Sequence, residues 1–330
     1  MGGSDGRIEG RIKFMPVPYL NYDRSLGFMF GAIPMVMFNP VEKDTVSPSS
    51  LVGGLGMYTT NKTWFAMGFG MFHFDRDNWR LIIAGGRGTV HYQFYKDILS
   101  GIWIPYEADA TFAVIKLERR IYQDLYGGVS YSYANILTSL ENLPLTDTVR
   151  LHGAGFYLSL DQRENPYYPT HGYYSNIEFN GFPEWLGNEA ASQKIDLDHN
   201  HYFPLRADRD VLAVRFFAGL GLGDLTFNQQ YIVGNNDIRG YTQGEFRGNY
   251  LLALQGEYRW NFLPRWGAVG FAGLATVFEA INEDDSGKLL PGVGAGIRFR
   301  VFKETNFSVG IDAAKGIRDW GISFQIGEAF

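Results

Sequence analysis

The stretch Tyr250–Phe262, which reads YLLALQGEYRWNF, decides the fold because its residues alternate in character. One set of alternate positions carries apolar residues: Leu252, Leu254, Tyr258, Trp260 and Phe262. The other set carries polar residues: Gln255, Glu257, Arg259 and Asn261. A period of two places these sets on opposite faces of a β-strand, whereas an amphipathic helix repeats every 3.6 residues. The stretch is therefore predicted to be a strand with one apolar and one polar face.

The same alternation recurs along the chain and predicts sixteen strands. They fall at 14–22, 26–38, 49–60, 63–74, 79–94, 108–121, 126–137, 148–160, 172–181, 192–203, 211–223, 249–262, 266–278, 289–302, 306–314 and 320–329. Most exceed the ~9–11 residues that a tilted strand needs to cross a bilayer, and tryptophans stand near strand ends. A soluble β-sandwich has strands about half as long. We expect an all-β, sixteen-stranded antiparallel transmembrane β-barrel.

Composition narrows the function classes. Residues 1–11 contain Ile8-Glu9-Gly10-Arg11 and are interpreted as an expression tag with a protease site, leaving 12–330 as a single barrel domain. Cysteine is absent, which excludes disulfides and thiolate metal sites. The net charge of −6 without a basic cluster argues against a nucleic-acid partner. No cofactor, metal site or enzymatic motif is indicated.

The connections differ in length between the two sides of the predicted barrel. If both chain ends are periplasmic, Asp224–Gly248 is extracellular and the longest connection, while several periplasmic turns are tight. The periplasmic connection Asn39–Pro48 is long and does not fit this rule. Glycines share the polar face of two strands, at Gly219, Gly221 and Gly223 and at Gly292, Gly294 and Gly296. They either form a groove for the long connection or ease bending of the wall.

Three motifs stand in order at matching strand positions. Asp161, Arg163, Pro166, Pro169 and Gly172 mark a predicted periplasmic turn, Ile238-Arg239-Gly240-Tyr241 lies in the longest connection, and the chain closes with ISFQIGEAF. Over residues 12–330 this arrangement resembles the bacterial surface antigen superfamily of outer-membrane assembly and secretion barrels, the BamA, TamA and FhaC type, without their periplasmic repeat domains. The resemblance implies location in the bacterial outer membrane.

The resemblance also implies a role for the long connection. In that family the loop folds into the barrel lumen, and the arginine matching Arg239, within the Arg239-Gly240-Tyr241 motif, pairs with acidic wall residues. Glu257 matches one acidic partner, and its alternation independently places it inside. The second acidic position falls at Gly273, so Asp312 or Glu279 is expected to substitute.

The first predicted strand contains Pro16 and Pro18, which remove two backbone donors. A closed barrel has no edges, so this strand must meet the last one, and the seam is expected to involve Pro16, Pro18, Tyr19, Phe324 and Phe330. The resemblance implies a lateral gate at this seam. Alternatively, the prolines lie in a lead-in before the strand.

We therefore expect a barrel for protein insertion or secretion that acts through a weak first–last seam. Its expected partners are outer-membrane lipid, an unfolded β-barrel or secreted polypeptide as substrate, and a separate periplasmic partner if soluble domains are missing. A passive or gated pore is one alternative. An export or anchoring barrel for a missing soluble domain is another.

Overall fold

The computed structural model describes residues 12–23, 25–41, 43–97, 101–140, 144–165, 168–206, 209–234, 237–302 and 307–330. Residues 1–11, interpreted as a tag, lie outside the described residues. The wall strands are β1 Ile12–Asp23, β2 Gly27–Phe38, β3 Ser50–Thr59, β4 Trp64–Phe74, β5 Trp79–Lys96, β6 Ile102–Tyr122, β7 Leu125–Leu140, β8 Thr146–Asp161, β9 Gly172–Phe182, β10 Ser192–Leu205, β11 Asp210–Gly223, β13 Arg247–Asn261, β14 Trp266–Ala280, β15 Leu290–Phe302, β16 Phe307–Lys315 and β17 Trp320–Ile326. A two-residue strand, β12 at Tyr231–Ile232, lies in the connection between β11 and β13 and pairs with β13.

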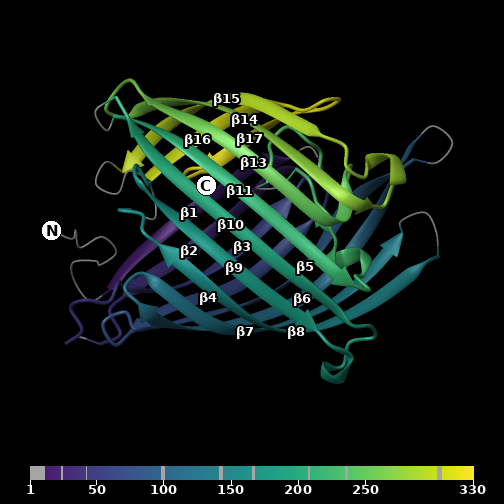
Figure 1. The fold of residues 1–330 in the computed structure, drawn as a ribbon, viewed down its shortest axis with the longest axis horizontal. Coiled ribbons are helices and arrows are strands. Elements are labelled where there is room, and N and C mark those ends of the chain that lie inside the picture. The colour runs from purple at the N-terminus through teal and green to yellow at the C-terminus, as the bar shows by residue number, and fades with distance from the viewer. Residues whose placement is uncertain are drawn as a thin grey trace.

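Consecutive wall strands pair antiparallel from β1 through to β17, with β11 paired directly to β13. The strands run steeply tilted across the molecule (Figure 1). β1 and β17 approach each other, with Cα atoms within 8 Å, which brings the first and last strands together. The predicted sixteen-stranded antiparallel barrel is confirmed, in a nearly closed form. We call the end where β1 begins and β17 finishes the near end, and the opposite end the far end.

The two faces of the wall differ as the alternation predicted. On β13, Leu254 and Trp260 are 51% and 46% exposed on the outer face. Glu257 and Arg259, on the inner face of the same strand, are 0% and 2% exposed. An apolar outer surface with buried charge is the reverse of a soluble protein and suits a wall surrounded by lipid.

In the part of the chain that the structure describes, helical structure is limited to three short 3-10 turns at Glu184–Leu186, Phe227–Gln229 and Glu283–Asp285. Across the described ranges, no helix has the length and apolar character needed to cross a membrane.

Strand boundaries depart from the prediction most clearly at two places. β6 begins at Ile102, six residues before the predicted start, because Ile102–Ala108 pairs with the end of β5. β17 was predicted to reach residue 329 but ends at Ile326. Gly327 adopts a φ of +81°, and its N–H donates to the carbonyl of Ser308 at 2.8 Å. The chain turns out of the wall there, since a positive φ is readily adopted only by glycine.

The long connection between β2 and β3, described at residues 39–41 and 43–49, has a structural explanation. It folds onto the turn between β4 and β5, where the Asp44 carboxylate accepts the backbone N–H of Arg76 at 2.8 Å and of Ser47 at 2.9 Å. The Ser47 hydroxyl in turn accepts the N–H of Asp77 at 2.7 Å. Its length therefore serves to cover a neighbouring turn at the near end of the barrel.

Candidate functional site: the seam and the buried charge ring

The prolines of β1 lie on the edge that faces β17. Pro16 pairs with Pro34 and Pro18 with Ala32 on β2. Even-numbered residues of β2 direct their backbone groups towards β3, as the carbonyl of Phe28 shows by accepting Thr60 N–H at 2.9 Å. In an antiparallel pair, partners of such residues direct their own groups the opposite way. The two missing N–H groups are therefore on the β17 side, within the strand and not in a lead-in.

The other side of the seam is also weak. β17 has seven residues, fewer than the ~9–11 that a crossing strand needs. Within the residues that the structure describes, backbone ladders join each consecutive pair of wall strands but none joins β1 to β17. Of the other predicted seam residues, Tyr19 lies in β1 and Phe324 lies in β17, the two strands that meet.

The connection between β11 and β13 packs against the inner face of the wall. Its buried apolar residues form one cluster with residues of β13, β14 and β15, comprising Tyr231, Val233, Ile238, Tyr241, Phe246, Leu251, Ala253, Ala275, Val277 and Leu290. Two of the noted glycines provide the space. A side chain at Gly219 would collide with the Tyr231 ring, and a Cβ at Gly292 would lie 2.6 Å from the carbonyl oxygen of Arg239. These contacts favour the groove interpretation over simple wall bending.

Arg239, in the connection between β11 and β13, pairs with two acidic residues of the wall. Its Nη2 donates to Glu257 Oε2 at 2.7 Å and its Nη1 to Asp312 Oδ2 at 2.6 Å, and both carboxylates are fully buried. The guanidinium also lies 3.4 Å from the centre of the Phe271 ring. Asp312 thus supplies the second acidic partner, whereas Glu279 accepts a hydrogen bond from Asn249 instead. Gly240 has a φ of +104°, and Tyr241 donates through its hydroxyl to the carbonyl of Pro291 at 2.6 Å.

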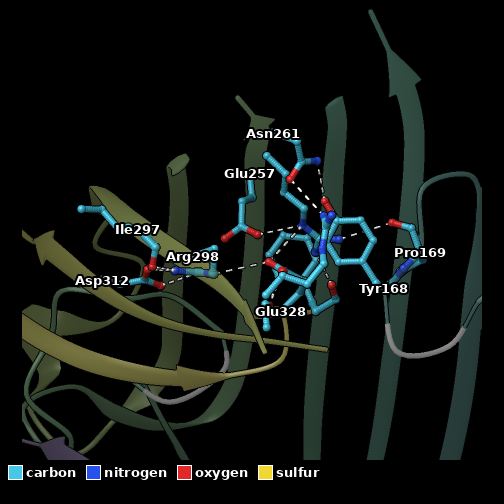
Figure 2. A network of polar contacts seen from close by, with 12 residues as sticks. Tyr168, Pro169, Glu257, Asn261, Ile297, Arg298, Asp312 and Glu328 are labelled. Atoms are coloured by element: carbon cyan, nitrogen blue, oxygen red, sulfur yellow. Dashed lines mark hydrogen bonds and ion pairs between the residues drawn. The ribbon is translucent and has the colours of Figure 1, made fainter. Parts of the chain in front are cut away.

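These contacts are part of a closed ring of alternating charges. Glu257 Oε1 also accepts from Arg259 Nε at 3.0 Å, and Arg259 Nε is 3.6 Å from Glu328 Oε2. Glu328 Oε2 is 3.4 Å from Arg298 Nε, and Arg298 pairs with Asp312, which returns to Arg239. Figure 2 shows Glu257, Arg298, Asp312 and Glu328 in this arrangement. Three guanidinium groups and three carboxylates balance, which is the condition for stable burial of charge.

Glycines also make room within the ring. A side chain at Gly296 would collide with the Asp312 carboxylate, and a Cβ at Gly310 would lie 2.6 Å from Arg298 Nη1. The ring therefore needs small residues in β15 and β16 as well as its charged ones.

The chain matches the Omp85 superfamily domain over residues 58–330. It belongs to the Omp85 superfamily. Its fold is similar to BamA from Haemophilus ducreyi lacking POTRA domains 1–3, with a TM-score of 0.67, 13% identity, and coverage of 96% of this chain and 70% of that one. A search of curated proteins gave no match.

Two CdiB structures share the fold. CdiB from Acinetobacter baumannii has a TM-score of 0.65 and 14% identity, and CdiB from Escherichia coli has 0.67 and 12%. Each alignment covers 96% of this chain but only 59% and 62% of the CdiB chains, so the chain spans less than two thirds of their length. This Omp85 barrel is an outer-membrane protein, and its family is consistent with a role in assembly or secretion.

The predicted turn motif of the Omp85 barrel reaches the ring. In the connection between β8 and β9, Arg163 donates to the Asp161 carboxylate through Nε and Nη2, both at 2.7 Å. Gly172 has a φ of +91° where β9 begins. The carbonyl of Pro169 accepts a hydrogen bond from Arg259 Nη1 at 3.4 Å (Figure 2). Pro166 lies outside the described residues.

Phe330 differs from its predicted place. It was expected to close the last strand at the seam, but it follows β17 and packs against the buried side chains of Tyr202, Val211 and Ala213. Its main-chain oxygen accepts a hydrogen bond from Arg259 Nη2 at 2.6 Å. The segment after Gly327 therefore lies on the inner side of the wall, because its partners are inner-face residues.

Three members of the ring were not predicted from the sequence as site residues. Arg259 shares the inner face with Glu257 two positions away, a signal that was available. Arg298 stands among the inward positions of β15, while Glu328 lies beyond the last strand, where alternation gives no information.

Proposed function

We propose that this chain inserts or secretes polypeptides in the outer membrane by opening the seam between β1 and β17. The observation that carries the proposal is the position of Pro16 and Pro18, which remove two N–H groups from the edge that faces β17. Every other interface in the described wall has a ladder of backbone pairs, so the free energy needed to separate strands is lowest here.

The seam would offer an incoming polypeptide a strand edge. A substrate strand can pair with the β17 edge or with the donor-poor β1 edge through main-chain hydrogen bonds, which need no particular side-chain sequence. The proposed substrate is an unfolded β-barrel or a secreted polypeptide, with outer-membrane lipid around the wall and a separate periplasmic partner delivering the substrate. No hydrolytic step or cofactor is part of the mechanism.

A disulfide across the seam tests this proposal. The chain has no cysteine, so pairs can be introduced without background. Cysteine at Tyr19 is combined with cysteine at each of positions 322–325, and the pair that forms a bond in oxidant is selected. Ser132 and Gly153, which pair across β7 and β8, provide a matched control disulfide in the intact wall.

The assay is folding of a test barrel into liposomes that contain the protein. Oxidation of the seam pair is expected to abolish the acceleration of folding, and reduction is expected to restore it, while the control pair has no effect. Full activity with an oxidised seam would overturn the proposal. Steady ion conductance without any effect on the test barrel would indicate a pore, and inactivity in both assays would indicate an anchoring barrel.

A further inference from the structure

Methionine is distributed unevenly along this chain. Apart from Met1, every methionine lies between residues 15 and 71 and has an odd number: Met15, Met29, Met35, Met37, Met57, Met67 and Met71. They belong to β1, β2, β3 and β4, the four strands that follow the seam. Because side chains alternate along a strand, the methionines within each strand share one face of the wall.

This face points into the barrel. Tyr92 of β5 donates its hydroxyl to Gln243 Oε1 at 2.9 Å, in the connection that packs inside the wall, so even-numbered residues of β5 point inward. Ile82 is one of these residues, and it pairs directly with Met71 of β4. Direct partners in an antiparallel sheet project on the same side. The registers carry this orientation from β4 to β3, β2 and β1, so all these methionines face the lumen.

Most of the methionines are accessible from the lumen. Six of them are at least partly exposed: Met15, Met35, Met37, Met57, Met67 and Met71. We call these six residues the methionine face. Met71 is 39% exposed, whereas Met29 is buried. The buried hydrophobic clusters formed by the described residues lie on β10 to β16, the connection between β11 and β13 and the C-terminal segment, and none includes a residue of β1 to β4.

Glycines let the larger apolar side chains lie along the sheet. A Cβ at Gly53 would lie 3.0 Å from Met35 Cγ and 2.7 Å from Phe69 Cζ, so these two side chains occupy the space over the glycine. Methionine is unbranched and flexible, and it adapts to apolar partners of irregular shape. The apolar surface ends at β6, where the inward Lys116 forms an ion pair with Glu178 at 2.7 Å.

The strands next to the seam are apolar on their lipid side as well. Phe14 and Leu20 of β1 and Phe28 and Phe30 of β2 are exposed on the outer face. β1 therefore carries apolar side chains on both faces, and within the described residues no backbone ladder joins it to β17. An acyl chain that passes round this edge from the bilayer to the lumen stays in contact with apolar side chains, so its methylene groups remain out of water.

An acyl chain fits this surface better than a polypeptide does. A peptide lying on the methionine face would bury backbone N–H and C=O groups against side chains that offer no hydrogen bonds, which is costly. A hydrocarbon chain has no such groups. Lys13, exposed at the near end of β1 on the same face and paired in register with Met37, supplies a cation for a phosphate.

We propose that the methionine face is a binding site for a phospholipid, with the phosphate at Lys13 and the acyl chains along the methionines towards the far end. The near end carries both chain ends and is expected to face the periplasm, so the bound lipid has the orientation of the periplasmic leaflet. The route round β1 rests on the proposed opening of the seam. The site itself does not depend on the insertion or secretion of a polypeptide.

Photolabelling of the full chain in lipid nanodiscs tests the site. The nanodiscs contain phosphatidylglycerol with a diazirine in its acyl chain, and adducts are assigned to residues by mass spectrometry after irradiation. Adducts on the outer face of β1 to β4 are the internal reference for a folded barrel in lipid. Adducts on the methionine face are expected to exceed those on inward positions of β7 to β9 by about tenfold, the factor that removing roughly two methylene groups from water provides.

Two substitutions at Met71 form a matched pair. Met71→Leu keeps the surface apolar and is expected to retain the labelling. Met71→Gln has a similar shape but adds a polar amide, and it is expected to lower adducts on the direct partners Leu51 and Ile82 severalfold.

A substitution at Lys13 tests the position of the head group. Lys13→Gln is expected to lower labelling by phosphatidylglycerol by about threefold, the size of an exposed charge interaction. It is expected to leave labelling by the corresponding diacylglycerol unchanged, because that lipid has no phosphate. An equal loss with both lipids would overturn the assignment of the phosphate to Lys13.

Three results would overturn the site. Adducts confined to the outer face would show that lipid does not occupy the lumen. Equal labelling of the methionine face and of inward positions of β7 to β9 would show unselective entry. An equal loss in Met71→Gln and Met71→Leu would show that packing, and not apolar character, determines the labelling.

The polypeptide alternative is read in the same way. An unfolded test barrel carrying photo-leucine, added in place of the lipid probe, would label the methionine face if a polypeptide is the occupant. Such labelling, combined with lipid adducts on the outer face only, would replace phospholipid by polypeptide. The folding assay is a separate measurement, because a barrel that does not accelerate folding is still expected to be labelled by lipid.

Discussion

Replacing Arg239 with alanine is expected to destabilise the barrel by about 4 kcal/mol. Two charge-assisted hydrogen bonds, at 2.7 and 2.6 Å, are lost from fully buried carboxylates, and each such bond contributes roughly 1.5–3 kcal/mol. The contact with the Phe271 ring adds about 0.5–2 kcal/mol. The total stays below the gross sum because Arg259 and Arg298 still pair with the two carboxylates, so neither is left without a cation.

The variant Arg239→Lys keeps the positive charge but removes the planar guanidinium group, so it tests the two contributions separately. One ammonium group cannot present the two parallel donors of a guanidinium to two different carboxylates. This variant is expected to lose about half as much stability as the alanine variant. Lys116→Ala is the control: its ion pair with Glu178 has 26% and 18% of the two side chains exposed, so about 1 kcal/mol is expected.

The assay is equilibrium unfolding in urea with the barrel in lipid bilayers, followed by tryptophan fluorescence. The free energy of unfolding of each variant is compared with that of the unchanged chain at one lipid composition. If Arg239→Ala loses no more stability than Lys116→Ala, the ring does not hold the connection, and the reasoning is refuted.

Three further changes test separate features. Pro18→Thr restores an N–H on the seam edge and is expected to slow amide exchange in β17 severalfold and to lower insertion activity; unchanged exchange would contradict the edge assignment. Gly292→Ala places a Cβ 2.6 Å from the Arg239 carbonyl oxygen and is expected to cost about 1–3 kcal/mol of unfolding free energy, while Gly270→Ala, with nothing within 4 Å, should be neutral. Burial opposes ionisation of Asp44, but hydrogen bonds from Ser47, Arg76 and Val46 hold its pKa below the ordinary value. Because the pKa of Asp44 is lower in the folded chain, its ionised carboxylate stabilises the folded connection at pH values above the unfolded pKa of ~3.9, and this stabilisation is lost as the pH falls. Proteolysis of residues 39–49 should therefore accelerate below about pH 4 in the unchanged chain, and this acceleration should be absent in Asp44→Asn.

The wall could be predicted from the sequence because the alternation of apolar and polar residues within each strand identifies its outer and inner faces. The alternation in Tyr250–Phe262 placed Glu257 inside without any knowledge of the rest of the chain, and the exposed fractions agree. The end of β17 could not be predicted in the same way. Ser323, Gln325 and Gly327 continue the polar set, and only the backbone conformation of Gly327 shows that the strand has ended.

The sequence predicts which side chains point inward, but not which inward side chains contact one another. Alternation places Asp312 inside, but several inward carboxylates compete for Arg239, and the choice depends on how strands far apart in sequence are arranged around the barrel. The resemblance placed the second acidic partner at position 273, which is a glycine in this chain. In the structure, Asp312 of β16 pairs with Arg239 instead. Apart from Glu257 and Arg259 on β13, the six charges of the ring are far apart in sequence. They lie on β13, β15, β16, the long connection and the segment after β17, so the ring as a whole has no local signature.

The barrel is closed by backbone pairing along most of its wall and by side-chain contacts near the seam. Pro16 and Pro18 remove two backbone donors from the β1 edge, and within the described residues no backbone ladder joins β1 to β17, so backbone pairing contributes little to this interface. The compensating contacts lie elsewhere, at Thr242, Arg239 and Glu328, and none of them is a bond between the two seam strands. A barrel closed only by its ladder would have to break many bonds in sequence to open. Here the segments on either side of β17 are held in addition by side-chain contacts at Asp319 and Glu328, beside the ladder that joins β17 to β16.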